Sequence, residues 1–253
     1  MFNRIAEQYR NRTAVVIGAG GIGGEISRFL SSQVARLVVA DRDPKLLARI
    51  AGPGVGSAQI TTRTLDVQDG QGVADFFRFV QTTVGTPDFL FYTAGILNIE
   101  SFAETSDEIW NRAVNVNLNG AFYCTKGAAD LMRPAGKGSI LLLASISGTK
   151  ARSGTRVNPV YNTTKAGLVA LVNATAMQLR PFGVRINCIS PGPTSTAMMD
   201  VQPPQVHSAV GEISLDGRMN NPTEVAELAL FVAAHGRFTG EDLGMGGGAG
   251  LGG

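Results

Sequence analysis

The sequence predicts an α/β protein with a doubly wound parallel sheet of about seven strands and helices on both of its faces. Two observations lead to this prediction. Short runs of β-forming residues alternate with helical patterns along nearly all of the 253 residues, as they do in proteins with parallel sheets. The runs TAVVI, RLVVA and SILLLA are apolar or nearly so throughout, which is typical of strands that are buried on both faces.

The elements can be placed in chain order. Strands are expected at 13–17, 36–40, 60–65, 89–92, 139–144 and 185–190. Helices are expected at 22–31, 44–50, 73–83, 107–132, 161–180 and 223–234, the last after Pro222, which suits a first helical turn.

The C-terminal end, GEDLGMGGGAGLGG, is rich in glycine. Because glycine weakens strands, the seventh strand is left open. No repeat, linker or change in composition divides the chain. We therefore expect one domain over residues 1–253, with a glycine-rich tail at 244–253.

Composition excludes several classes of function. The net charge is +2 without a basic block, so nucleic acid is not expected as a partner. No apolar run reaches the roughly 18 residues of a membrane helix, and the charged N-terminus lacks a signal-peptide core. Two isolated histidines and two separated cysteines make a metal site unexpected. The chain is predicted to be cytoplasmic, without a membrane partner.

Tyr161 and Lys165 stand four residues apart in YNTTK, and Ser145 precedes them in LLLASISG. Positions i and i+4 of a helix share one face, so the phenol and the ammonium are expected to be neighbours. A nearby positive charge lowers the pKa of a phenol, which would make Tyr161 an acid or base near neutral pH. Alone the motif is weak, because Tyr and Lys at this spacing are usually a solvated helix face.

A glycine-rich turn follows the first expected strand and opens the first expected helix. Its residues are Gly18, Ala19, Gly20, Gly21, Ile22 and Gly23. Glycines allow a close approach of the backbone to a pyrophosphate, and a helix N-terminus offers it free N–H groups. The alternative is a tight turn without a ligand.

Asp41 ends the second expected strand and is followed by Arg42. A carboxylate here can accept hydrogen bonds from ribose hydroxyls and repels a 2′-phosphate, so we predict NAD as the cofactor. NADP stays open because the Arg42 guanidinium can bind that phosphate. The alternative role of Asp41 is to cap the turn into Pro44, with Arg42 solvated.

With these motifs in this order, nearly the whole chain resembles the classical short-chain dehydrogenases/reductases, which implies a single-domain Rossmann-type fold. Further matches are Leu65-Asp66-Val67, Ala94-Gly95, the segment from Trp110 to Asn117, and Pro191-Gly192-Pro193-Thr194-Ser195-Thr196. By this resemblance the cofactor is bound by the segments Leu65-Asp66-Val67, Ala94-Gly95 and Pro191 to Thr196. Asp66 would contact the adenine, and Thr196 would bind the nicotinamide carboxamide.

The resemblance also implies an NAD(P)-dependent oxidoreductase that interconverts a secondary alcohol and a ketone. Tyr161 would exchange the proton with the substrate oxygen, which Ser145 would hold and polarise. Lys165 would lower the tyrosine pKa and, with Tyr161, bind the cofactor at its nicotinamide ribose. Asn117 would link Lys165 to solvent through a water. Hydride would pass between the nicotinamide and the substrate carbon.

The sequence departs from the family pattern at four places. The glycine turn is one residue shorter than usual, with Ile17 where a threonine is expected. Thr93 replaces the asparagine before Ala94-Gly95, and its hydroxyl is expected to substitute in part. The Ser145–Tyr161 spacing is slightly long, and the C-terminus lacks its usual ending. None of these changes affects Asn117, Ser145, Tyr161 or Lys165.

The substrate is the least defined prediction. Arg152 and Arg156 precede the Tyr161 helix, and an arginine pairs well with a carboxylate; the alternative is a solvated loop. Met198 lies in an expected substrate lid near 194–219, where methionine suits irregular apolar ligands. We therefore include a cyclic or carboxylated alcohol, such as a dihydrodiol, among the hypotheses.

Two other functions stay open. One is a nicotinamide-binding sensor or scaffold without turnover, although such a protein has no need of all four catalytic residues. The other is an isomerase or dehydratase that uses internal redox on the same fold. A homotetramer is expected from the family, with helices 107–132 and 161–180 packed across a two-fold axis, and a dimer is the alternative.

Overall fold

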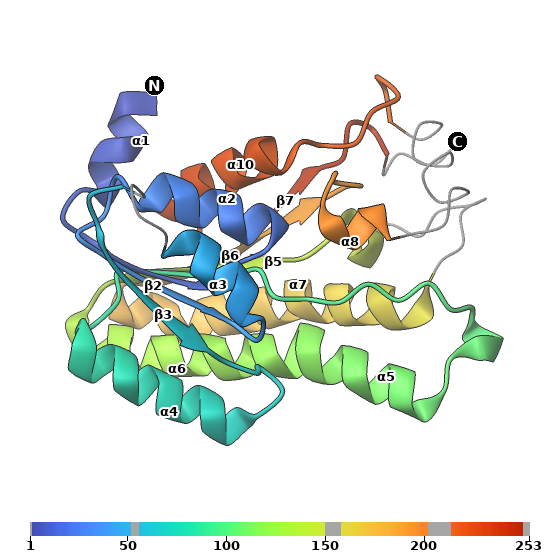
Figure 1. Cartoon of the computed structure of the whole chain (residues 1–253), viewed down its shortest axis with the longest axis horizontal. Coiled ribbons are helices and arrows are strands. Elements are labelled where there is room, and N and C mark those ends of the chain that lie inside the picture. Colours follow the sequence, from blue (N-terminus) through green and yellow to red (C-terminus); the bar gives the residue numbers. More distant parts are fainter. Residues whose placement is uncertain (1, 52–55, 150–157, 202–213, 250–253) are drawn as a thin grey trace.

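The computed structural model describes residues 2–51, 56–149, 158–201 and 214–249. Its centre is a seven-stranded sheet, parallel throughout, in the order β3-β2-β1-β4-β5-β6-β7 (Figure 1). The strands are β1 (Thr13–Ile17), β2 (Arg36–Asp41), β3 (Gln59–Thr64), β4 (Phe89–Tyr92), β5 (Gly138–Leu143), β6 (Val184–Pro191) and β7 (Asp242–Met245). The predicted doubly wound parallel sheet is confirmed, and its central strands are fully buried as expected.

The seventh strand, which the sequence left open, is present. β7 pairs with β6 in the register Cys188↔Asp242 to Pro191↔Met245. The Met245 carbonyl accepts two further hydrogen bonds, from the Gly192 N–H at 2.8 Å and the Asn220 side-chain amide at 2.9 Å. These partners lie far away in the sequence, so they can fix a strand that its own glycine content does not favour.

Helices cover both faces of the sheet (Figure 1). On one face lie α1 (Phe2–Tyr9), α2 (Gly21–Leu30), α3 (Pro44–Ile50) and α10 (Pro222–Ala234). On the other lie α4 (Gly70–Thr83), α5 (Asp107–Val114), α6 (Gly120–Ala135) and α7 (Pro159–Leu179). Each face buries its own apolar cluster against the strands. No helix among the described residues is long and apolar enough to cross a membrane.

Helix α1 was not predicted. Its Tyr9 is fully buried, and the phenol donates a hydrogen bond to the Leu230 carbonyl of α10 at 2.7 Å. The Tyr9 ring also packs on Phe29 and Phe89. Short helices are stabilised mainly by tertiary packing, so the local sequence gives little sign of this one.

The helical stretch predicted at 107–132 is present, and a π-helical turn, η2 (Asn115–Asn119), lies within it between α5 and α6. The turn contains Asn117, which is fully buried. π-turns inside α-helices often mark functional sites. The π-turn therefore falls at a residue for which the sequence had predicted a function.

Candidate active site

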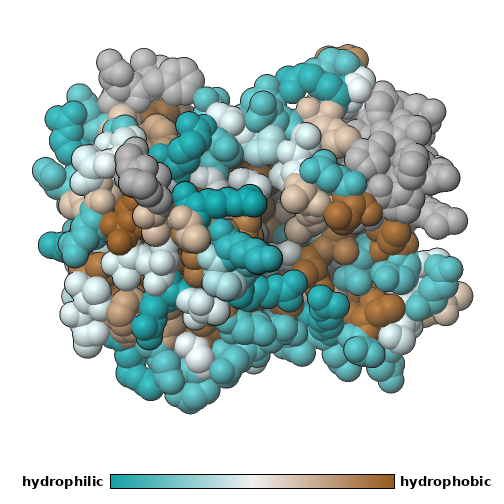
Figure 2. All heavy atoms as spheres, viewed as in Figure 1, coloured by the Kyte–Doolittle hydropathy of each residue, from teal (hydrophilic) through white to brown (hydrophobic). Residues whose placement is uncertain are grey.

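A cleft of about 1110 Å³ opens along the carboxyl ends of the strands, where open α/β sheets bind ligands. The face drawn in Figure 2 is hollowed near α8 (Ala197–Asp200), and hydrophobic residues gather around the hollow. Most of the predicted site residues line this cleft: Gly18, Gly20, Gly21, Ile22, Gly23, Asp41, Arg42, Asp66, Val67, Ala94, Gly95, Ser145, Tyr161, Lys165, Pro191, Gly192, Thr194, Thr196 and Met198.

The glycine turn joins β1 to α2 and needs glycine at two positions. Gly18 has φ of +99°, a conformation that residues with a Cβ rarely adopt. A Cβ on Gly23 would overlap the Gly18 carbonyl oxygen and the Thr93 hydroxyl. These two glycines are therefore required for the close packing of the helix against the strand.

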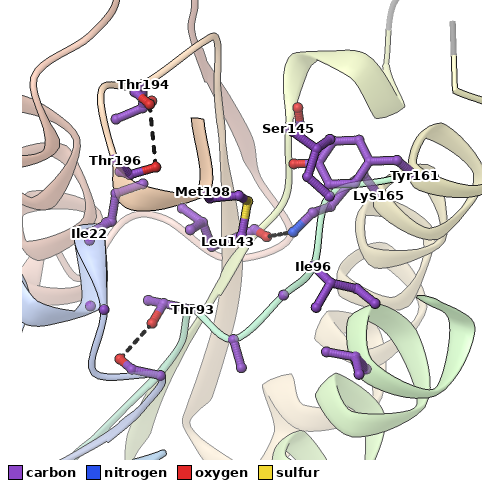
Figure 3. Close-up of a pocket in the computed structure, with 18 of the residues that line it drawn as sticks. Ile22, Thr93, Ile96, Leu143, Ser145, Tyr161, Lys165, Thr194, Thr196 and Met198 are labelled. Atoms are coloured by element: carbon purple, nitrogen blue, oxygen red, sulfur yellow. Dashed lines mark hydrogen bonds between the residues drawn. The ribbon is translucent and has the colours of Figure 1, made fainter. Parts of the chain in front are cut away.

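Thr93 supports the same turn, as the sequence suggested. Its hydroxyl lies 3.0 Å from the Ile17 carbonyl oxygen and 3.0 Å from the Gly18 carbonyl oxygen (Figure 3). A threonine has one hydroxyl proton to share between these two acceptors, whereas an asparagine amide has two. Thr93 therefore supplies only part of the hydrogen bonding that an asparagine amide would give at this position.

Asp41 does not point freely into the cleft. Its Oδ2 accepts a hydrogen bond from the Ala19 N–H at 2.7 Å, and its Oδ1 accepts one from the Asp43 N–H at 2.8 Å. The carboxylate therefore connects the glycine turn to the start of α3, close to the capping role given as the alternative. Each oxygen has a further lone pair, so these bonds leave room for hydroxyl donors. Arg42 beside it is exposed on the same rim.

The residues at this end fit a dinucleotide. The N-cap of α2 is Gly20, which has no side chain to occupy the first N–H groups of the helix, and a helix N-terminus attracts a phosphate. Gly21 and Thr196 face each other closely across the cleft, and a Cβ on Gly21 would meet the Thr196 side chain. The absence of that Cβ keeps the cleft open between the two residues. Asp66, at the far end, is exposed and turns its carboxylate to the Gln68 N–H at 3.0 Å.

Ser145 and Tyr161 lie side by side in the other half of the cleft (Figure 3). Ser145 follows β5, and Tyr161 is in the first turn of α7. Burial raises the pKa of Tyr161, and the hydrogen bond with Ser145 lowers it by a smaller amount. A hydroxyl pair of this kind can hold one substrate oxygen and exchange a proton with it.

Lys165 lies beside Tyr161, as the i, i+4 spacing predicted, and its ammonium also binds a backbone carbonyl. Its Nζ donates a hydrogen bond to the Leu143 carbonyl at 2.7 Å and lies 5.6 Å from the centroid of the Tyr161 ring (Figure 3). Burial lowers the Lys165 pKa to about 8. The Tyr161 pKa is raised in this structure and not lowered as expected, because burial outweighs the hydrogen bond with Ser145.

Asn117 is set behind the cleft and does not line it. Its Oδ1 accepts from the Ile96 N–H at 2.8 Å, and its Nδ2 donates to the Ile96 carbonyl at 3.0 Å and to the Thr164 hydroxyl at 3.1 Å. Both Asn117 Oδ1 and Lys165 Nζ face Gly95. The side chain therefore holds the segment after β4 in place beside the lysine.

Three asparagines that line the cleft were missed: Asn98, Asn158 and Asn162. Asn158 is buried and caps α7, its Oδ1 accepting from the Tyr161 N–H at 2.7 Å. The dipeptide Asn158-Pro159 is a usual helix start and could have located it, since the helix begins at Pro159 and not at 161. Asn98 also lines the cleft, and its Oδ1 is buried without a hydrogen-bond partner among the described residues. No local signal indicates Asn98.

The predicted substrate contacts are only partly within the described residues. Met198, in α8, lines the cleft, and its side chain extends toward the middle of Figure 3. Arg152 and Arg156 lie outside the described residues, as does the part of the expected lid at 202–213. The C-terminal tail is described up to residue 249.

Comparisons with known proteins agree with this geometry. A family model described as enoyl-(acyl carrier protein) reductase matches residues 17–249. A (3R)-3-hydroxyacyl-CoA dehydrogenase of Mus musculus is 32% identical over 96% of this chain and 99% of its own. A cis-4-hydroxycyclohexanecarboxylate dehydrogenase of Sinomonas cyclohexanicum is 30% identical over 91% of this chain and 92% of its own.

Among solved structures, a short-chain dehydrogenase/reductase from Brucella melitensis superposes with a TM-score of 0.86 at 31% identity. It covers 96% of this chain and 98% of that one. The glycine turn, the Ser145–Tyr161 pair and strands β2 to β7 all lie within the region that the family model matches. The chain belongs to the short-chain dehydrogenase/reductase family of NAD(P)-dependent oxidoreductases.

Proposed function

We propose that this enzyme interconverts a secondary alcohol and a ketone, with Tyr161 as its acid and base. The observation that carries the proposal is the position of Ser145 and Tyr161, side by side on the cleft that also contains the glycine turn. One cleft can thus hold a dinucleotide and present a hydroxyl pair to a substrate oxygen. The bound nicotinamide supplies or accepts the hydride.

The protein's own residues have the following roles in this proposal. In oxidation, the Tyr161 phenolate takes the proton of the substrate hydroxyl; in reduction, the phenol returns it. The Ser145 hydroxyl holds the same oxygen and favours the phenolate through its hydrogen bond. Lys165 holds the cofactor ribose, and Asn117 takes part in proton exchange with Lys165 beside Gly95.

We propose NAD as the preferred cofactor, held by the glycine turn, Asp41, Asp66, Val67 and the segment 191–196. A carboxylate beside the turn favours ribose hydroxyls over a 2′-phosphate, and Asp41 is fixed there by two backbone N–H groups. Arg42, exposed at the rim, is the residue through which NADP would be accepted.

For the substrate we propose a cyclic alcohol that carries a second polar group, a carboxylate or a hydroxyl. One relative is named for a hydroxycyclohexanecarboxylate, which is a ring of this kind. Asn98 and Met198 both line the cleft, and Met198 gives it an adaptable apolar surface. A carboxylate would pair with Arg152 or Arg156.

The proposal is tested by following nicotinamide absorbance with NAD and a panel of alcohols. The panel compares cyclohexanol, 4-hydroxycyclohexanecarboxylates, cyclic diols, acyclic polyols and 3-hydroxyacyl-CoA thioesters. We expect oxidation, with the highest kcat/KM for the substituted rings. Absence of absorbance change with every alcohol and every corresponding ketone would favour the sensor or the internal-redox enzyme. A best substrate among the acyclic compounds would refute the proposed ring.

We also propose that residues 1–253 act as one cytoplasmic domain that assembles as a homotetramer or a dimer. Large apolar side chains are exposed on the helices expected at the interface: Trp110 on α5, Phe122 on α6 and Met177 on α7 are 39%, 47% and 69% exposed. Such residues are typical of surfaces that other subunits cover. Light scattering of the purified protein measures the assembly.

A further inference from the structure

The buried side chain of Asn158 makes two hydrogen bonds, one as an acceptor and one as a donor, to two different segments of the chain. Its Oδ1 accepts from the Tyr161 N–H of α7 at 2.7 Å, and its Nδ2 donates to the Glu100 carbonyl at 2.8 Å. Glu100 belongs to the segment that follows β4, 58 residues away in the sequence. The amide therefore joins the helix of Tyr161 to a different part of the cleft wall.

The segment from Ile96 to Glu100 is held at both ends. Asn117 binds the Ile96 N–H and carbonyl, and Asn158 binds the Glu100 carbonyl. Between these two points the segment lines the cleft with Leu97, Asn98 and Ile99. Neither Asn117 nor Asn158 binds the glycine turn that is assigned to the cofactor. The segment 96–100, which they hold, is therefore part of the cleft wall that a substrate would contact.

We infer that Asn158 is a positioning residue, which fixes the distance between the Tyr161 hydroxyl and the wall segment 96–100. This inference rests on the proposed function, since it assigns that wall to the substrate. Without the bond to Glu100, the segment keeps the Asn117 bonds at Ile96 but loses its anchor at Glu100, so Leu97, Asn98 and Ile99 are no longer fixed in the cleft wall from both ends. Without the bond to the Tyr161 N–H, the first turn of α7 loses its cap, and the backbone that carries the acid/base residue is no longer held by Asn158.

The two bonds can be separated by substitution. In Asn158→Ser the hydroxyl can still cap α7, because serine is a good N-cap, but the shorter side chain does not reach Glu100. Asn158→Ala removes both bonds. A matched control is Asn221→Ser: Asn221 caps α10 through the Thr223 N–H at 2.9 Å and does not line the cleft.

We expect Asn158→Ser to raise the KM for the alcohol about tenfold, with kcat and the Kd for NADH changed less than about threefold. Asn158→Ala should in addition lower kcat about tenfold, because the Tyr161 N–H loses its acceptor. Asn221→Ser should change neither constant. This split between KM and kcat would not arise from a loss of stability alone.

A second measurement does not depend on turnover. Amide hydrogen exchange at 97–101, followed by mass spectrometry, should be faster in Asn158→Ser than in the wild type and unchanged in Asn221→Ser. Unchanged exchange would refute the connection itself, whereas faster exchange with an unaltered KM would refute its role in positioning. If the wild type oxidises no alcohol, the proposed function fails, and the exchange result still decides whether Asn158 holds the wall.

Discussion

The two halves of the cleft are built in different ways. In the cofactor half, the backbone of the glycine turn forms the surface of the cleft: the Gly18 N–H donates to the Ala40 carbonyl at 2.8 Å, and the Ala19 N–H donates to the Asp41 carboxylate. In the substrate half, side chains set the shape, through Asn117 and Asn158.

The difference follows from what each half has to bind. A pyrophosphate has to approach backbone N–H groups closely, and few backbone geometries allow this. Those geometries need glycine at fixed positions, so the glycine turn can be recognised from its residues alone. A substrate wall can be assembled from many side chains on loops, whose positions depend on distant partners. Tyr161 and Lys165 lie where the two halves meet, and the following changes test how separate the halves are.

The largest effect is expected from Tyr161→Phe. The change removes the hydroxyl that exchanges the proton, so kcat should fall by about a thousandfold. Cofactor affinity should fall far less than kcat, because the glycine turn, Asp41 and Lys165 are untouched. Steady-state rates and fluorescence titration with NADH measure the two effects. Turnover above a tenth of the wild-type value would exclude Tyr161 as the acid/base residue.

Gly23→Ala should damage the cofactor half instead. The new Cβ would overlap the Gly18 carbonyl and the Thr93 hydroxyl, so the turn must move. We expect NADH affinity to fall about a hundredfold, together with a loss of about 2 kcal/mol in the free energy of unfolding. The control is Gly236→Ala, where no atom lies within 4 Å of the added Cβ. Equal NADH affinity in the two variants would show that the turn is not a binding element.

Asp41→Asn tests the link between the turn and cofactor choice. One amide oxygen cannot replace two carboxylate oxygens, so the bond to Ala19 or the bond to Asp43 is lost. NADH affinity should fall about tenfold and NADPH affinity less, because the negative charge is gone.

The matched control for this change is Asp69→Asn, at a helix cap that accepts from the Gln71 N–H at 3.0 Å and does not line the cleft. Titrations of each variant with both reduced cofactors measure the ratio of affinities. A ratio of NADH to NADPH affinity that is the same in Asp41→Asn as in the wild type would contradict the role of Asp41.

The smallest expected effect concerns pH. Oxidation needs the Tyr161 phenolate, and burial raises its pKa, so kcat for oxidation should rise with pH into the alkaline range. Ser145→Ala removes the hydrogen bond that lowers this pKa, so the rising limb should move to higher pH. The pH dependence of kcat at saturating NAD measures the shift. Movement to lower pH in Ser145→Ala would contradict the assignment.

Much of the cofactor half could be predicted because its signals are local. Strand β1, the glycine turn and the start of α2 are consecutive in the chain, and each follows from hydrophobic pattern and glycine position. The substitute role of Thr93 was also predicted, and its hydroxyl lies 3.0 Å from two carbonyl oxygens of the turn.

The substrate half depended on contacts between distant segments. Asn117 was singled out from a motif, yet its burial, its place in a π-turn and its bonds to Ile96 are known only from the folded chain. Likewise, the Asn158-Pro159 dipeptide indicates a helix start, but nothing in it indicates a bond to Glu100.

Residues close in the chain were enough to predict the alternation of strands and helices and the glycine turn, and to give the order of Ser145, Tyr161 and Lys165. The tertiary structure decided the pairing of β7, the burial that raises the Tyr161 pKa, and the bond from Lys165 to Leu143. Each of these is set by groups distant in the chain, which only folding brings together. Electrostatics and hydrogen bonding respond to these spatial neighbours rather than to sequence neighbours.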